Sequence, residues 1–178
     1  MATMTRTTVW TAWSVMAIGA VLLAQAPAPD LSGTWRLNRS ASQITAGVGL
    51  AGLDRGGVPN TLYVTQAANG TLTIGSDHNQ GLARAYMVGG ESAIPAAPSG
   101  TVSVKTRWDG RTLVVESANG AAPGGSALRE LLAISPDAQT LTVTVTLTAT
   151  EGAKTTTLVY SKTQAEAPCK SWPTPCRN

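Results

Sequence analysis

The sequence predicts a small all-β domain in which successive antiparallel strands form an up-and-down meander. Turn signals recur about every 8–12 residues after the first 30 residues, which is typical of sandwiches and barrels. β-branched residues are dense, and their restricted side chains suit a half-buried strand better than a helix. Asn69-Gly70 and Asp109-Gly110 each separate two alternating segments, and both dipeptides tolerate the positive φ angles of a tight hairpin turn. We therefore expect strands to pair with their neighbours in the sequence.

The expected strands follow one another closely, and a few longer connections separate them. Strands are expected at residues 31–37, 61–66, 71–75, 82–88, 101–108, 111–118, 126–134, 140–149 and 153–162. Residues 38–60 are rich in Gly, Ala and Ser without a clear period, so we expect a long, mobile loop with one helical turn near Ser40. Residues 89–100 and 119–125 are also expected to be loops.

The segment 140–149 predicts which side of the sheet is buried. Leu and Val occupy its odd positions from 141 to 147 and Thr its even positions, so one face is apolar and the other polar. The same alternation places Val102, Val104 and Trp108 inside on another strand. A one-sided antiparallel meander can hide its edges by closing into a barrel, here of about 8–9 strands. A more open barrel and a sandwich are the alternatives.

Residues 1–26 are expected to be a secretory signal peptide. Arg6 supplies a positive charge, residues 12–24 form a short apolar run, and the tripeptide AQA at 24–26 fits the small-x-small pattern of a cleavage site. Cleavage two residues earlier is an alternative, because a proline follows the tripeptide. A membrane anchor is the competing interpretation, but the run is shorter than the roughly 20 residues that span a bilayer. The chain is therefore predicted to be periplasmic or secreted, without stable membrane insertion.

The two cysteines, Cys169 and Cys176, both lie in the C-terminal tail, residues 163–178, which follows the expected domain of residues 30–162. An even number of cysteines in an exported protein favours a disulfide. A metal pair is the alternative, but two thiols without a nearby His or carboxylate make a poor zinc site. A bridge over so short a loop is expected to order the tail rather than to hold the domain together.

The charge and the aromatic content argue against some classes of partner. The net charge is +3, and the basic residues are scattered along the sequence. A nucleic-acid-binding surface needs a basic patch and stacking aromatic side chains, so nucleic acid is not an expected partner. The sequence has no Phe, and the expected inner face is mainly Leu, Val, Ile and Ala. That face lacks the aromatic platforms expected for sugars or bases.

Three segments occur in a characteristic order: LSGTWRLN at 31–38, RWDGRTLVVE at 107–116 and LAISPDAQTLTV at 132–143. With them, residues 30–162 resemble secreted bacterial lipocalin-like (calycin-type) proteins of unknown function. The resemblance implies a barrel that holds a small hydrophobic molecule, in which Trp35 plugs one end. It also implies a late basic residue packed on this Trp, for which Lys162 is the nearest candidate, although Arg would be usual.

Glu130 is the candidate site residue in the most unusual setting. Alternation along its strand places it on the same face as Leu128 and Leu132. A carboxylate buried among apolar side chains needs a basic partner or a donor from a ligand. Arg84 and Arg36 are the candidate partners. The alternative is that the strand turns its other face inward, or that a bulge shifts its register.

Three further residues are weighed as tentative site residues. Tyr86 follows Arg84 by two residues on the same expected face and is a candidate for lining the mouth of a pocket. Trp108 is a tentative ligand contact, although a core position is the simpler interpretation for it. His78, the single histidine, is expected in a solvated loop. No nucleophile-and-base constellation stands out, so we predict no catalytic residue, no metal and no cofactor.

Three functions remain open at this point. The first is a non-enzymatic, exported lipocalin-like domain that binds a small hydrophobic ligand. The second is an envelope domain with a filled core that binds a protein partner, which large inward side chains without a cavity would favour. The third is an enzyme built in the barrel, which a His and a carboxylate facing one deep pocket would favour. The pattern names neither a ligand nor an oligomeric state.

Overall fold

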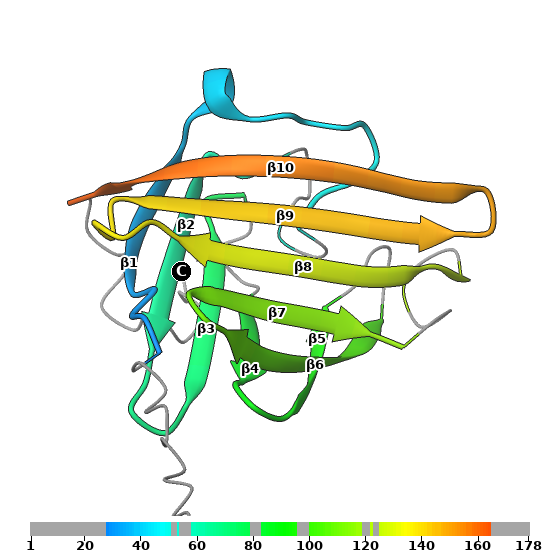
Figure 1. Cartoon of the computed structure of the whole chain (residues 1–178), viewed down its shortest axis with the longest axis horizontal. Coiled ribbons are helices and arrows are strands. Elements are labelled where there is room, and N and C mark those ends of the chain that lie inside the picture. The colour runs from blue at the N-terminus through cyan, green and yellow to red at the C-terminus, as the bar shows by residue number, and fades with distance from the viewer. Residues whose placement is uncertain are drawn as a thin grey trace, which may run out of the picture.

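Ten antiparallel strands form a single sheet in the computed structural model of the chain, which describes residues 28–50, 53, 58–78, 83–95, 100–118, 122 and 125–164 (Figure 1). The strands are β1 (Gly33–Leu37), β2 (Thr61–Gln66), β3 (Thr71–Ser76), β4 (Ala83–Met87), β5 (Glu91–Pro95), β6 (Thr101–Asp109), β7 (Thr112–Ser117), β8 (Ala127–Ile134), β9 (Thr140–Ala149) and β10 (Gly152–Thr163). Their order is β4-β3-β2-β1-β10-β9-β8-β7-β6-β5. Apart from β1 with β10, each pairing joins consecutive strands, so the predicted meander is confirmed.

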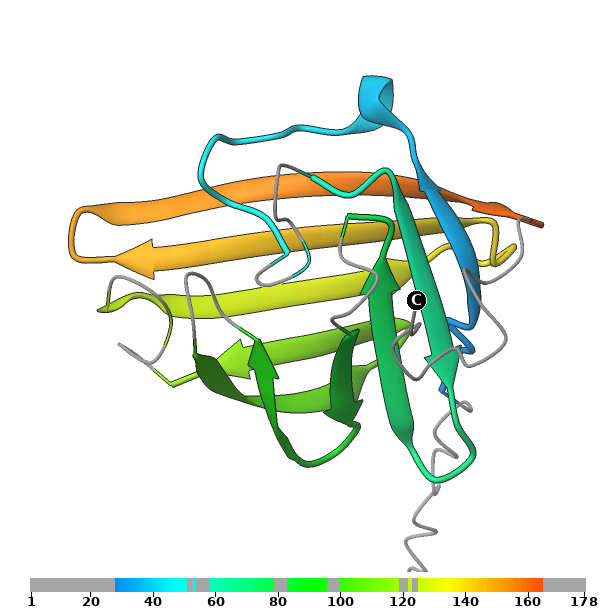
Figure 2. The ribbon, with the colours of Figure 1, turned by 180° about the vertical axis from the view of Figure 1, so that it is seen from behind.

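The meander curls into a nearly closed barrel because its first and last strands pair. β1 and β10 run side by side from the Thr34–Thr163 pair to the Leu37–Tyr160 pair. The sheet ends at β4 and β5, which are joined by a tight turn at residues 88–90. There the Gly89 backbone N–H donates to the carbonyl oxygen of Thr106 on β6 at 2.9 Å. Seen from behind, β2 and β3 cross in front of the long strands β8–β10 (Figure 2).

Alternation along the strands gives the barrel an apolar inner face, as the sequence predicted. On β9, Leu141, Val143 and Val145 are fully buried, whereas the Thr side chains between them are partly exposed. On β6, Val102 and Val104 are buried in the same way. Buried side chains from all ten strands and from the segment after β1 meet in one contiguous cluster. This cluster, with two-residue periodicity in each strand, holds the two walls of the barrel together.

One strand lies where the sequence predicted a loop, and that prediction is wrong. β5 occupies residues 91–95, inside the expected loop of residues 89–100. It forms because Ile94 is fully buried and pairs with Val102 on β6. Pro95 ends the strand, and proline is tolerated there because β5 is an edge strand whose far side needs no ladder. Tertiary pairing thus overrides the Gly- and Pro-rich composition of the segment.

The segment after β1, expected to be a mobile loop, is held against the barrel by specific contacts. The helical turn expected near Ser40 is present as a 3-10 helix, η1 (Arg39–Ala41). The next residues follow β10, where Gln43 and Thr157 exchange backbone hydrogen bonds of 2.7 and 2.8 Å. Val48 and Leu50 are then buried in the core. We call residues 43–50 the cap segment, because they lay apolar side chains against one end of the barrel interior.

Some predictions fall on residues outside the described part of the chain. The expected signal peptide, residues 1–26, and the expected Cys169–Cys176 disulfide both lie there. Within the described residues, no helix has the length and hydropathy of a membrane span.

Candidate ligand site

Two strands that are not neighbours in the sheet bring three polar side chains together inside the barrel. Alternation on β4 turns Arg84 and Tyr86 inward, while Ala83, Ala85 and Met87 are partly or well exposed. Alternation on β8 turns Glu130 inward together with Leu128 and Leu132. The side chains of Arg84, Tyr86 and Glu130 are all fully buried. Because β4 and β8 do not pair, the contact between them crosses the barrel interior.

The three side chains form a closed triangle of hydrogen bonds. Nη1 of Arg84 donates to both Oε1 and Oε2 of Glu130 at 2.9 Å, and to Oη of Tyr86 at 2.7 Å. The Tyr86 hydroxyl in turn donates to Oε2 of Glu130 at 3.3 Å. Arg84 and Glu130 are therefore a buried ion pair, and Tyr86 contacts both charges. We call these three residues the polar cluster.

Aliphatic side chains surround the polar cluster. In the sheet register, Glu130 lies between Val115 on β7 and Val145 on β9, and both valines are fully buried. Arg84 lies beside Ile74 of β3, which is also buried. Two opposite charges in such a setting attract strongly, but each has lost its hydration. The cluster is therefore polar in an otherwise apolar interior. The attraction between its two charges and the free-energy cost of removing them from water are of similar size.

Burial and charge together set the protonation states of the cluster. Burial alone lowers the pKa of Arg84, but the carboxylate of Glu130 and the oxygen of Tyr86 outweigh it and raise the pKa above its ordinary value. Burial raises the pKa of Tyr86 well above its ordinary value of 10.0, with Arg84 opposing and Glu130 adding to the shift. At neutral pH the site thus holds a guanidinium cation and a neutral phenol, which can both donate and accept a hydrogen bond.

Trp35 lies where the first and last strands pair, opposite Lys162. Its side chain is fully buried, and its Nε1–H donates to the carbonyl oxygen of Leu31 at 3.0 Å. Nζ of Lys162 lies 5.2 Å from the centre of the Trp35 ring, so the expected basic residue packs on this Trp. Gly33 makes room for it, because a Cβ there would lie 2.8 Å from Cε of Lys162 and its φ is +142°. A glycine two residues before Trp35 therefore has a direct steric reason.

The other tentative site residues lie apart from the polar cluster. Trp108 is half-buried near the end of β6, packs on the core and pairs in register with Leu113. Arg36, the alternative partner of Glu130, is exposed on β1. The sequence suggested that Tyr86 lines the mouth of a pocket, but its side chain is fully buried and does not reach the surface. His78 is half-buried in the turn after β3. No group of three metal-ligating side chains occurs among the described residues.

Sequence reasoning missed the buried polar groups that tie the segment after β1 to the barrel. Oγ1 of Thr156 donates to the carbonyl oxygen of Val48 at 3.0 Å, and Oγ of Ser76 donates to that of Leu53 at 3.0 Å. Oη of Tyr160 donates to the carbonyl oxygen of Pro59 at 3.2 Å. These contacts left no signal in the sequence, because the acceptors are backbone atoms in a segment without a period.

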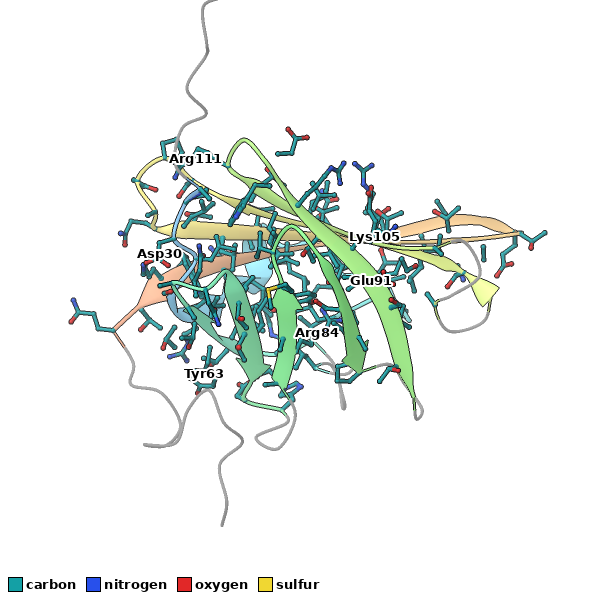
Figure 3. The ribbon with its side chains drawn as sticks, turned by 90° about the horizontal axis from the view of Figure 1, so that it is seen from below. Asp30, Tyr63, Arg84, Glu91, Lys105 and Arg111 are labelled. Atoms are coloured by element: carbon teal, nitrogen blue, oxygen red, sulfur yellow. The ribbon has the colours of Figure 1, made fainter. Side chains whose placement is uncertain are left out.

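The described residues line several grooves. One, of about 520 Å³, runs over residues Gly89–Glu91 and the outward side chains of Lys105, Arg107 and Glu116. Another, of about 160 Å³, lies between the cap segment and the tips of β8–β10, beside Val48 and Leu147. Figure 3 shows Glu91 and Lys105 on adjacent strands, with Arg84 nearer the middle of the molecule and Tyr63 at its periphery. None of these grooves includes a member of the polar cluster.

Comparisons with known proteins give structural matches. No family model matches the sequence, and no curated protein matches it. The zebrafish ileal bile acid-binding protein, solved with cholic acid, is 15% identical, with a TM-score of 0.51 over 75% of this chain and 98% of that chain. A fatty acid-binding protein from Drosophila melanogaster brain is 19% identical, with a TM-score of 0.51 over 74% of this chain and 99% of that chain. Fatty-acid-binding protein 1 of Echinococcus granulosus is 15% identical, with a TM-score of 0.50 over 74% and 96%.

These matches establish the fold. The chain has an antiparallel barrel like that of these proteins, and the expected lipocalin-like architecture is confirmed.

Proposed function

We propose that this protein is a non-enzymatic carrier that holds a small hydrophobic molecule inside its barrel, with the polar end of that molecule at the polar cluster. The observation that carries the proposal is the fully buried Arg84–Tyr86–Glu130 triangle within an otherwise aliphatic interior. Ligand sites are typically apolar, with a few convergent polar groups that fix the orientation of the ligand. The fold, shared with proteins named for binding fatty acids and bile acids, supports the same function.

Stability alone gives no reason for the polar cluster. Replacing a buried ion pair by apolar side chains of similar size is often neutral or stabilising, because each ion has lost its hydration. Val115 and Val145 on either side of Glu130 are typical of what such a position would otherwise hold. A site that orients a ligand, in contrast, requires fixed hydrogen-bonding groups in an apolar wall. The cluster therefore fits recognition better than it fits packing.

The two edges of the sheet offer a route into the interior. β4 and β5 are the ends of the strand order, and their described residues form no ladder with each other. They are held together near the turn, where the backbone N–H of Met87 on β4 donates to Oγ of Ser92 on β5 at 2.7 Å. Arg84 lies on β4, at the opposite end of the strand from this turn. Separating the strands there would break no β-ladder and would lead to the cluster.

We also propose that the carrier works outside the cytoplasm. The apolar run at residues 12–24 and the AQA tripeptide at 24–26 support export and cleavage of a signal peptide. Cys169 and Cys176 in the tail suit an oxidising compartment. Fractionation of the producing cells, with mass measurement of the mature N-terminus, tests this: a cytoplasmic protein with an intact leader would contradict it.

One observation favours a second candidate function, a domain with a filled core that binds a protein partner. The grooves near Lys105 and beside the cap segment include no member of the polar cluster. If the interior admits no ligand, the outer groove near Lys105 and Glu116 becomes the better site to examine.

Uptake of an environment-sensitive apolar dye by the mature protein separates the two functions. We expect the folded protein to bind the dye and to lose affinity by roughly tenfold in Tyr86→Phe, which removes one hydrogen-bonding group. Tyr63→Phe is the matched control, because Tyr63 lies on the outward side of β2 and should leave binding unchanged. Native mass spectrometry of protein from its own source should show an extractable adduct. A bare monomer without dye uptake would reject the carrier and favour the partner-binding domain.

A further inference from the structure

The ion pair inside the barrel balances its own charge. Among the described residues, Arg84 and Glu130 are the buried side chains that carry a full charge, and they are in direct contact. The net charge of the described interior is therefore zero before any ligand enters. This balance decides which polar group of a ligand can approach the polar cluster, and the inference below rests on the carrier function proposed above.

A carboxylate ligand would meet repulsion at the cluster. To reach Nη1 of Arg84, it would come next to both oxygens of Glu130, which lie 2.9 Å from that nitrogen. Two anions would then share one cation in an apolar setting, where charges interact strongly because little water screens them. Displacing Glu130 instead would leave its own carboxylate buried among Val115, Val145 and Leu132.

A hydroxyl group on the ligand would meet both a donor and an acceptor. The carboxylate oxygens of Glu130 have further lone pairs and can accept from it, and the phenol of Tyr86 can accept or donate. Burial raises the pKa of Tyr86, so the phenol stays protonated. Three other buried hydroxyls are engaged with backbone oxygens: Ser76 with Leu53, Thr106 with Met87 and Thr156 with Val48. Among the described residues, the cluster is thus the part of the interior that presents charged groups to a ligand.

We infer that the barrel selects an uncharged apolar ligand with a hydroxyl head group, and that it discriminates against a carboxylate of the same hydrocarbon chain. The preference follows from the contact of Glu130 with Arg84 across the interior. The ligand's hydroxyl donates to Glu130, and the Tyr86 phenol turns its single proton from Glu130 to the ligand's oxygen. The hydrocarbon part of the ligand lies against the aliphatic wall.

Calorimetric titration of the mature wild-type protein tests this without any substitution. The ligands are a saturated fatty acid, its primary alcohol and its methyl ester, all of one chain length and below their aggregation concentrations at neutral pH. We expect the alcohol to bind at least tenfold more tightly than the acid, and the ester to fall below the alcohol because it cannot donate. Equal or tighter binding of the acid would overturn the inference and leave the carrier function intact. Failure of all three to bind would overturn both.

Removing the negative charge of Glu130 gives an independent test. Glu130→Gln leaves Arg84 as a net positive charge, so the acid should gain at least tenfold relative to the alcohol. Glu116→Gln is the matched control, because Glu116 faces outward on β7 and should leave the ratio unchanged. If circular dichroism shows that Glu130→Gln does not fold, the Arg84→Met/Glu130→Met variant replaces it and should bring the ratio close to one. An unchanged ratio in a folded variant at position 130 would overturn the inference.

Discussion

Two groups of arginine and glutamate lie on opposite faces of the sheet, and β8 contributes a residue to each. On the outer face, Glu116 of β7 contacts Arg107 of β6 at 3.0 Å and Arg129 of β8 at 3.1 Å. On the inner face, Glu130 contacts Arg84 at 2.9 Å. The outer side chains are 41–55% exposed and the inner ones are fully buried. Arg129 and Glu130 are consecutive residues, so a shift of one position changes a solvated pair into a buried one.

The comparison shows that the contact distance of an ion pair says little about its contribution to stability. Exposed pairs are screened by water and salt, and each contributes about 0–1 kcal/mol. In the interior, each charge depends on its partner, because water cannot replace the lost interaction. The outer ion pairs therefore contribute little to stability, while the inner pair constrains which other groups the interior can contain.

Removing one member of the inner pair should have the largest effect. Glu130→Ala leaves Arg84 buried without its carboxylate, and we expect the free energy of unfolding to fall by about 3–5 kcal/mol. Urea denaturation followed by tryptophan fluorescence measures it. Glu116→Ala, the same change one strand away on the outer face, should lose no more than about 1 kcal/mol. Equal losses in the two variants would show that burial does not govern the contrast.

Alkaline pH should weaken the fold through the buried tyrosines. Burial raises the pKa of both Tyr86 and Tyr160 above the ordinary value of 10.0. Above pH 10 the unfolded chain loses protons that the folded chain keeps, so stability is present below pH 10 and falls above it, by about 1.4 kcal/mol per pH unit for each tyrosine. Denaturation midpoints across this range measure the slope. Tyr86→Phe should reduce the slope, whereas Tyr86→Phe with a slope like that of wild type would contradict the assignment.

Replacing the entire polar cluster should restore the stability that one substitution removes. In Arg84→Met/Tyr86→Phe/Glu130→Met, no buried polar group of the cluster is left unsatisfied. We expect the free energy of unfolding to return to within about 1 kcal/mol of wild type or above it. If the triple variant is as unstable as Glu130→Ala, the cluster is a structural necessity and its recognition role loses support. A stable variant that no longer distinguishes ligand head groups would strengthen that role.

Salt should produce the smallest effect, and only on the outer network. At about 1 M salt the screening length is about 3 Å, so the stability difference between wild type and Glu116→Gln should shrink by less than about 0.5 kcal/mol. The difference between wild type and Glu130→Ala should stay constant, because salt ions do not reach the interior. A strong salt dependence of the inner pair would mean that solvent enters the barrel.

The sequence predicted much of this arrangement, because strand periodicity carries a clear signal. Alternation placed Glu130 inside, and the need of a buried carboxylate for a basic partner pointed to Arg84 or Arg36, of which Arg84 is the partner in the structure. The same alternation carried Tyr86 inward with Arg84. The contact itself depends on barrel closure, which brings β4 opposite β8 and which no local pattern encodes.

Two segments could not be predicted for a different physical reason. β5 is Gly- and Pro-flanked and forms through its ladder with β6, so local composition favoured a loop. The cap segment has no period because few of its side chains face the core, and backbone contacts to β10 hold it in place. In both cases long-range partners determine the structure, and propensity has little influence.

The closure of the barrel also sets an order of events for folding. Near the seam of β1 and β10, the backbone N–H of Thr45 reaches Oγ1 of Thr156 across 111 residues of sequence. Contacts of such separation form slowly, because the chain must first lose the entropy of a long loop. A chain growing from its N-terminus can assemble the hairpins from β2 to β9 one after another, but Trp35 meets Lys162 only after the final strand is present. Pairing of the last strand, β10, with β1 therefore closes the barrel late in folding. A chain that lacks this strand would retain hairpins around an interior that is open to water.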